Sequence, residues 1–348
     1  FLGKATGGER PIAIMGVIGR IILKYRKGAA TKWCSEKAGF WDCAVSKSSA
    51  LQAALRRTLR CELAIWNGDK ACMMLWDAEQ FYDNVAIDEV AAKAVEMDFP
   101  ILGLAMAYQL HSGQRVLRAN KCYSQTVSDI SASILPGCTL SGHLVRVLLY
   151  HVLEEAHQRF RANAPFQYVD DLAAAICGSE EEIEEVAVES GHFINDEFSR
   201  LGLPISSKSM ILPQSLGAVR RAAKRLQKCG ISLKVVKEGR DLGVDATAAT
   251  GRGHKVFEGR GAKAKKRAAR IGNFANVNSG AKKLWKTGGM PQAAWGIEAF
   301  GISPEQIEGI RSLAAQASGG RSRVGRCKAS TIALERAGAA ELEDASLV

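Results

Sequence analysis

Two adjacent aspartates, in the stretch Tyr168-Val169-Asp170-Asp171, are the residues of this chain most suited to chemistry. Apolar residues flank them across positions 166–176, so the pattern predicts two short buried strands joined by a tight turn. Two like charges side by side repel each other, and holding them near a core requires a neutralising partner. A divalent cation with oxygen ligands is the usual partner, and magnesium is the one most often found with phosphates. The alternative is a solvated turn, which Asp favours on its own.

A third carboxylate, Asp77, follows an apolar run over residues 71–76 that predicts a buried strand, and Asp83 comes soon after it. A carboxylate at the end of a strand, beside a turn carrying two more, can hold two metal ions. Such ions activate an attacking hydroxyl and stabilise the leaving pyrophosphate in phosphoryl transfer. Taken alone, Asp77 is also explained as a helix N-cap, with Phe81 and Tyr82 in the core. The three carboxylates together favour the metal site.

Further blocks follow the order of the motifs of a known family. They are Arg10-Pro11-Ile12, Asp-Ala-Glu-Gln-Phe-Tyr-Asp at 77–83, Ile-Leu-Pro-Gly-Cys-Thr-Leu-Ser at 134–141, the aspartate pair within 166–172, Gly-Leu with a later Lys at 202–208, Arg-Asp-Leu-Gly-Val at 240–244, and a Trp-rich block at 284–296. In these blocks the chain resembles the reverse transcriptase domain of non-LTR (LINE-type) retrotransposons and, more distantly, group II intron enzymes. Their shared order makes the resemblance more specific than any single block.

The resemblance implies an α+β fold, arranged as a right-hand polymerase. Fingers are expected over residues 1–70 and 86–130, an antiparallel-sheet palm over 71–85 and 131–246, a helical basic thumb and beyond over 247–317, and a loose basic tail over 318–348. The implied activity is that of a retroelement's RNA-directed DNA polymerase. Such an enzyme joins dNTPs to a primer 3′ end on an RNA template by two-metal nucleotidyl transfer.

The resemblance also implies roles for the acidic residues. Asp77 and Asp170 would be the principal ligands of two Mg²⁺ ions, with Mn²⁺ as the alternative ion. Asp171 would support the site, and the backbone carbonyl of Ala78 would add an oxygen ligand. Lys208 would donate a proton to the departing pyrophosphate, the alternative being an exposed lysine without a catalytic role.

Nucleotide contacts are implied in the same way. Tyr82 stands where the family has an aromatic ring beneath the sugar of the incoming nucleotide, and such a ring would clash with a 2′-hydroxyl. Arg10, together with Arg20 or Lys24, would hold the triphosphate, because guanidinium suits bidentate phosphate contact.

The block around Gly137 departs from the family at one position. Gly137 would let the backbone approach the template–nucleotide pair closely. Pro136 stands where the family usually has Gln, so a polar contact near the nucleotide is lost. Tyr168 is expected to shape the hairpin near the primer end.

The charge distribution separates the two halves of the chain. The net charge is +11, but the residues from Gly217 onward hold 25 basic and 11 acidic side chains, whereas the first 216 hold 22 and 25. This favours chemistry in the front half and polyanion binding behind it. The resemblance identifies the basic region with a thumb that grips an RNA–DNA hybrid by its phosphates. The candidate contacts are Lys263, Lys265, Lys266, Arg267, Arg270, Lys282 and Lys283.

Two alternatives remain for this basic region, a nuclear-localisation-like stretch and a merely soluble surface. Its aromatic residues Phe274, Trp285 and Trp295 are expected in the core, with stacking on bases as the alternative.

Hydrophobic periodicity predicts alternating helices and strands between these blocks. Helices are expected over 46–65, 86–112, 140–159, 180–201, 215–228, 262–287 and 303–317, strands over 71–76 and 210–212, extended chain over 114–128, and a flexible Gly-rich link over 247–262.

Composition excludes several classes of protein. The chain of 348 residues is 47% hydrophobic and 24% charged, as in globular proteins, and no apolar run is long enough to cross a membrane. The nine cysteines are scattered and odd in number, without a Cys-x-x-Cys pair. We therefore expect reduced thiols inside a cell and no disulfide framework or zinc site. For an active retroelement copy, a nuclear location is expected.

Two competing hypotheses remain open at this stage. A catalytically decayed remnant that only binds nucleic acid would agree with Pro136, although the carboxylates and Tyr82 are intact. An RNA-directed RNA polymerase would share the palm, although Tyr82 argues against ribonucleotide substrates. No endonuclease, RNase H cluster or zinc knuckle is visible in these residues, and protein partners cannot be predicted.

Overall fold

The computed structural model describes residues 2–3, 9–10, 13–119, 121–160, 163–251 and 253–318. The chain divides into two compact units, one from residues 1–49 and 64–235 and the other from 50–63 and 236–348. Each unit has a buried apolar cluster of its own. These two units do not test the predicted boundaries of fingers, palm and thumb, which stay a prediction.

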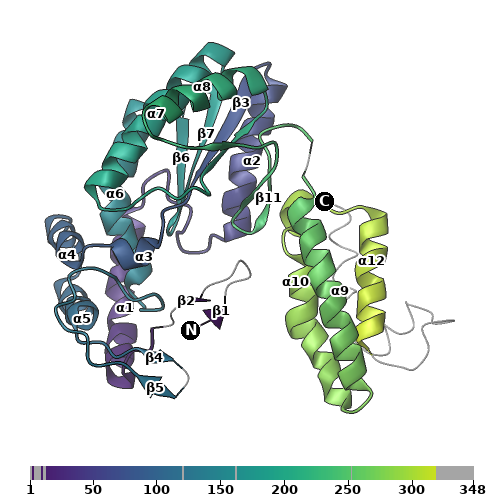
Figure 1. The fold of residues 1–348 in the computed structure, drawn as a ribbon, viewed down its shortest axis with the longest axis horizontal. Helices are drawn as coiled ribbons and strands as arrows, with labels where there is room; N and C mark the ends of the chain where they lie inside the picture. Colours follow the sequence, from purple (N-terminus) through teal and green to yellow (C-terminus); the bar gives the residue numbers. More distant parts are fainter. Residues whose placement is uncertain are drawn as a thin grey trace. The chain divides into compact units, whose positions relative to one another are not determined.

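A five-stranded sheet forms the centre of the first unit, in the order β6-β7-β3-β8-β9 (Figure 1). Its strands are β6 (Asn163–Tyr168), β7 (Asp171–Gly178), β3 (Lys70–Trp76), β8 (Met210–Pro213) and β9 (Lys234–Val235). Neighbouring strands are antiparallel, except that β9 runs parallel to β8. The predicted α+β class is confirmed, with a mixed sheet in place of a purely antiparallel one.

Three helices pack along this sheet: α6 (Ser141–Arg159), α7 (Glu180–Arg200) and α8 (Leu216–Lys228) (Figure 1). The helix α7 begins with a capping box, in which the Ser179 hydroxyl accepts from the Glu182 amide and the Glu182 carboxylate accepts from the Ser179 amide. This reciprocal pair satisfies two amides that have no partner within the helix.

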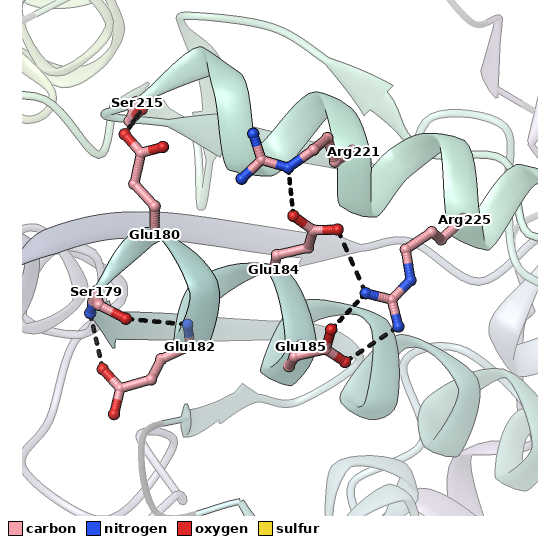
Figure 2. A network of polar contacts seen from close by, with 8 residues as sticks. All are labelled: Ser179, Glu180, Glu182, Glu184, Glu185, Ser215, Arg221 and Arg225. Carbon is pink, nitrogen blue, oxygen red and sulfur yellow. Dashed lines mark hydrogen bonds and ion pairs between the residues drawn. The ribbon is translucent and has the colours of Figure 1, made fainter.

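An ionic network joins α7 to α8 on the surface of the first unit (Figure 2). Arg221 Nε donates to Glu184 at 2.5 Å, and the Arg225 guanidinium forks between Glu184 at 3.3 Å and Glu185 at 2.6 and 3.0 Å. Exposed pairs of this kind contribute little individually. Together these ion pairs hold α8 against α7. The helix α8 in turn packs on β8 and β9 of the sheet.

Helices also form the part of the first unit around α6. They are α1 (Val17–Lys37), α4 (Ile87–Glu96) and α5 (Ile101–Ser112). The helical structure expected over 86–112 is confirmed for 87–96 and 101–112, with a break between the two helices. Asp98 adopts a left-handed φ of 57°, and Pro100 disfavours helical geometry in the residue before it.

Two small hairpins complete the described strands of this unit. They are β1 (Leu2–Gly3) with β2 (Glu9–Arg10), and β4 (Arg118–Ala119) with β5 (Cys122–Tyr123). The second lies within the stretch predicted to be extended.

Helices dominate the second unit, in which α9, α10 and α12 lie side by side (Figure 1). Its elements are most of α2 (Ala50–Trp66), the hairpin of β10 (Gly239–Asp241) and β11 (Val244–Ala246), α9 (Lys255–Ala275), a 3₁₀ turn (Ser279–Lys282), a π-helical turn (Trp285–Gly289), α10 (Met290–Ala294), α11 (Ile297–Phe300) and α12 (Pro304–Ala317). Ala264, Ala268 and Ile271 form the buried face of α9.

The flexible link expected over 247–262 is wrong from residue 255 onward, where α9 begins. Asp245 caps this helix from the neighbouring strand, because its carboxylate accepts from the amides of Val256 at 2.7 Å and Phe257 at 2.9 Å. A carboxylate also interacts favourably with the positive end of a helix dipole. Because the capping carboxylate is 11 positions away from the amide that it caps, no motif at the start of α9 predicts where the helix begins.

A buried ion pair joins α2 to β10 within the second unit. Arg57 Nη1 donates to Asp241 Oδ1 at 2.5 Å, and the two side chains are only 1% and 6% exposed. Separating such a pair leaves an uncompensated buried charge, which typically costs about 3–5 kcal/mol.

None of the described helices combines the length and hydropathy needed to cross a membrane. Cys34, Cys72, Cys122, Cys138 and Cys229 are free thiols.

Gly272 of α9 lies close against the backbone of α12. A Cβ there would lie 2.4 Å from the carbonyl oxygen of Gln316, whereas one on Gly261 would meet nothing within 4 Å. Ala is the better helix former by about 1 kcal/mol at either position, but overpacking at Gly272 costs about 1–3 kcal/mol. We expect urea unfolding to show Gly272→Ala less stable than Gly261→Ala by that packing cost. Equal stabilities would show that the two helices separate freely.

Candidate active site

The two aspartates lie where the sequence predicts, at a hairpin between β6 and β7. Tyr168 pairs with Asp171 across the hairpin, and Val169 and Asp170 form the turn. Val169 has a φ of 59°, a left-handed conformation that β-branched residues rarely adopt. Strain of this kind persists only where the surroundings hold it, and it concentrates at functional sites.

Gln167, which the sequence analysis missed, holds this turn. Its side chain is buried, and Nε2 donates to the Val169 carbonyl at 2.8 Å. Its backbone amide donates to Trp41 and its carbonyl accepts from Cys43, both at 2.8 Å. The available signal was an amide side chain directly after the apolar run of residues 164–166.

Pairing of β3 with β7 brings the third carboxylate to the same edge of the sheet. Trp76, the last residue of β3, pairs with Leu172, so Asp77 follows directly beside Asp171. Asp77 is half-buried, whereas Asp170 and Asp171 are exposed.

A loop before β8 fixes the backbone of Asp77. The buried Ser209 hydroxyl accepts from the Asp77 amide at 3.0 Å and donates to the Asp77 carbonyl at 3.2 Å, and the Ser206 amide donates to that carbonyl at 2.7 Å. Lys208 lies exposed in this loop, with its amide 3.2 Å from the Ser206 hydroxyl. Its catalytic role stays a prediction, as does a ligand role for the carbonyl of Ala78. Ala78 lies opposite Ile205 in an isolated β-bridge, whose hydrogen bonds are made by the Glu79 amide and the Asp77 carbonyl.

Tyr82 belongs to the short helix α3 (Phe81–Asn84) and packs against the core of the first unit. Burial raises the pKa of its phenol, and the negative charges of Asp170 and Asp171 raise it further. The carboxylates are therefore close enough to act on the ring electrostatically. The Tyr82 carbonyl also accepts from the Ile134 amide at 2.9 Å, which joins α3 to the Pro-Gly block.

Gly137 lines an open hollow of about 400 Å³ together with Arg20 and Lys24 of α1. It has a φ of 92°, which suits glycine, and a Cβ there would meet nothing within 4 Å. Two of the predicted triphosphate contacts thus lie beside it. Arg10 ends β2, and its side chain lies outside the described part of the chain.

His111 supports the same block from beneath and was not predicted. It is 1% exposed, and its Nδ1 accepts from the Leu135 amide at 3.0 Å. Burial, with a smaller effect from Arg115, lowers its pKa to about 4. A neutral imidazole therefore positions the residues before the exposed Pro136.

The residues at this edge of the sheet include oxygen donors of the kind that metal ions bind, but their side chains are not assembled into a metal site. Within the described ranges, no group of three or more His, Cys, Asp or Glu side chains is assembled to hold an ion. The available donors are Asp77, Asp170, Asp171 and the Ala78 carbonyl. Hard oxygen ligands are those that Mg²⁺ prefers, so the residue types fit the predicted ion.

In the second unit, α9 separates its cations from its apolar residues. Its five predicted contacts, Lys263, Lys265, Lys266, Arg267 and Arg270, are exposed, as is Lys283, and Lys282 is half-buried. Trp285 is buried as expected, but Trp295 and Phe274 are 40% and 51% exposed, so the core assignment is wrong for these two.

Comparison with known proteins gives one family and several distant structures. The family profile described as "Reverse transcriptase (RNA-dependent DNA polymerase)" matches residues 2–212. No curated protein matches the chain.

The similar solved structures include telomerases from Candida tropicalis. The complex with the TWJ fragment of telomeric RNA has a TM-score of 0.47 at 9% identity, covering 91% of this chain and 56% of that one. The apo enzyme has 0.45 at 12%, covering 93% and 50%. The chain thus spans about half the length of these structures.

Ser209→Ala tests the support beneath Asp77. The change removes both hydrogen bonds of the hydroxyl and leaves the Asp77 amide without that acceptor, so we expect a loss of about 1–3 kcal/mol in the free energy of unfolding. Ser207→Ala, in the exposed part of the same loop, is the matched control and should stay within about 0.5 kcal/mol. Urea denaturation measures both. Equal stability of the two variants would remove Ser209 from this role.

Proposed function

The chain belongs to the reverse transcriptase (RNA-dependent DNA polymerase) family, and from this premise we propose that it extends a primer 3′ end with dNTPs on an RNA template. We assign it to a retroelement of the non-LTR type, on the ordered motif blocks. The observation that carries the proposal is the register of β3 with β7, which puts Asp77 beside the turn of Asp170 and Asp171.

Metal binding is the first part of the proposal. Asp77 and Asp170 would hold two Mg²⁺ ions, or Mn²⁺ in their place, with Asp171 and the Ala78 carbonyl as further oxygen donors. The bound ions would supply activation of the primer hydroxyl and neutralisation of the leaving pyrophosphate. Three carboxylates at one edge repel one another, which favours cation binding there.

Substrate positioning is the second part. Tyr82 would lie beneath the sugar of the incoming nucleotide, and its rigid ring would exclude a 2′-hydroxyl. Arg20 and Lys24, with Arg10, would contact the triphosphate beside Gly137. Lys208 would donate a proton to the leaving pyrophosphate.

The nucleic acid is the third part. The template RNA and the DNA primer form a hybrid, whose phosphates the exposed cations of α9 would contact without reading sequence. Tyr168 would lie near the primer end. An intracellular and, for an active element, nuclear location agrees with this function.

Asp170→Asn and Asp77→Asn test the metal site. Each removes a charged ligand with little change in shape. Loss of a residue that only contacts a metal ligand can lower activity about a hundredfold, so loss of a ligand itself should reduce primer extension on an RNA template by more than that. Asp69→Asn, at the opposite end of β3, is the matched control and should extend normally. Normal extension by either site variant would exclude the assignment. A wild-type chain that binds hybrid but never extends would be a decayed copy.

Tyr82→Ala tests sugar selection. Loss of the ring opens space for a 2′-hydroxyl, so we expect discrimination between dNTPs and rNTPs, measured as the ratio of kcat/KM values, to fall about tenfold or more. Tyr82→Phe keeps the ring and should keep the discrimination. A wild-type preference for ribonucleotides would instead identify an RNA-directed RNA polymerase.

A further inference from the structure

A second basic hollow is lined wholly by residues of the second unit. It measures about 580 Å³, within the range of roughly 300–1,000 Å³ typical of ligand sites. Arg240 of β10 contributes to one side, and Lys255, Arg260 and Lys263 of α9 to another, with Trp295 completing the lining after α10. Cations from separate elements thus converge on one space.

The helix α9 presents an unobstructed face to this hollow. Lys255, Gly259 and Lys263 are spaced four residues apart, so they lie on one side of the helix. Gly259 lies between the two lysines, and a Cβ there would meet nothing within 4 Å. A phosphate can therefore approach the backbone between two ammonium groups.

The side chains that line the hollow carry only positive charge. None of the residues that line it is acidic, and in the described part of the chain no ion pair joins Arg240, Lys255 or Lys263 to an acid. Burial lowers the pKa of the Arg260 guanidinium and the positive charge of Arg240 lowers it further, while the negative charge of Asp245 opposes these two effects in part. An anion in this space would relieve that repulsion.

Trp295 adds an aromatic surface to the cationic one. Trp295 is 40% exposed, and its backbone carbonyl accepts from Arg260 Nη1 at 2.8 Å. The Arg260 guanidinium also lies over the indole ring, 6.0 Å from its centroid. Arg260 Nη2 also donates to the Gly243 carbonyl, so one side chain holds the β10–β11 turn and the Trp295 backbone in place. The indole is therefore a preorganised platform beside the cations.

We propose that this hollow binds one nucleotide unit of single-stranded nucleic acid, with its phosphate between Arg240, Lys255 and Lys263 and its base against Trp295. A base within a duplex is already stacked and paired, so an aromatic platform beside cations selects unpaired strand. The site goes beyond the proposed polymerase function, and of the hybrid contacts predicted from the sequence it includes Lys263 alone.

The test measures binding of a fluorescent, unstructured 12-nucleotide DNA by anisotropy, using the full chain without divalent metal or dNTP. Gly259→Asp places a carboxylate in the hollow, whereas Gly261→Asp adds the same charge to the same helix at a position that does not line it. Trp295→Ala removes the platform, with Phe274→Ala as the control for loss of an exposed aromatic.

We expect Gly259→Asp and Trp295→Ala each to weaken binding about fivefold or more, and both controls to stay within about twofold of wild type. Trp295→Ala should weaken the binding of blunt RNA–DNA hybrid less than the binding of single-stranded DNA. Equal binding by the two glycine variants, or full binding by Trp295→Ala, overturns the proposal. If Gly259→Asp alone fails to fold, as judged by circular dichroism, Trp295→Ala decides the outcome.

Two further arms separate the possible sources of failure. Competition with free dATP tests whether the ligand is a mononucleotide. If dATP displaces the oligonucleotide when both are present at the same concentration of nucleotide units, the proposal that the ligand is a strand is overturned. Asp170→Asn should bind the oligonucleotide as wild type does. A chain that binds in this way but does not polymerise would contradict the proposed function and leave this site intact.

Discussion

The pairing of β3 with β7 is the constraint on which the candidate active site depends. It runs without a break from Lys70 opposite Gly178 to Trp76 opposite Leu172, and most of both strands is buried. A slip of one residue would turn every side chain to the opposite face of the sheet, so the core permits only this register. The position of Asp77 beside Asp171 is therefore decided by apolar residues that take no part in any reaction.

Local patterns predicted the parts of this arrangement that depend on neighbours in sequence. The apolar runs gave strands β3, β6 and β7, and the paired aspartates gave the turn between two of them. The supports could not be found in this way. Ser209 binds the backbone of a residue 132 positions away, and His111 binds Leu135 across 24 positions. Serine and histidine at such positions are indistinguishable from ordinary core or loop residues until the chain is folded.

Helix limits failed for the same physical reason. One helix ends at Glu96 and the next begins after Pro100, although the apolar spacing continues across the break. At α9, a Gly-rich and basic composition suggested a link, but capping by Asp245 and burial of its alanines outweigh the weak helix propensity of glycine. Trp295 also stays at the surface, where the Arg260 guanidinium donates to its backbone carbonyl and lies over its ring.

The contact between Arg57 and Asp241 ties a segment from the first part of the sequence, residues 50–63, to the second unit. Their side chains meet although 184 positions separate them, and the family match ends at residue 212, between them. A fragment cut at that limit would keep α2 and remove the acid that its buried guanidinium contacts. The minimal stable piece of this protein therefore has to extend through the β10–β11 hairpin, so homology alone would choose the wrong end for expressing it.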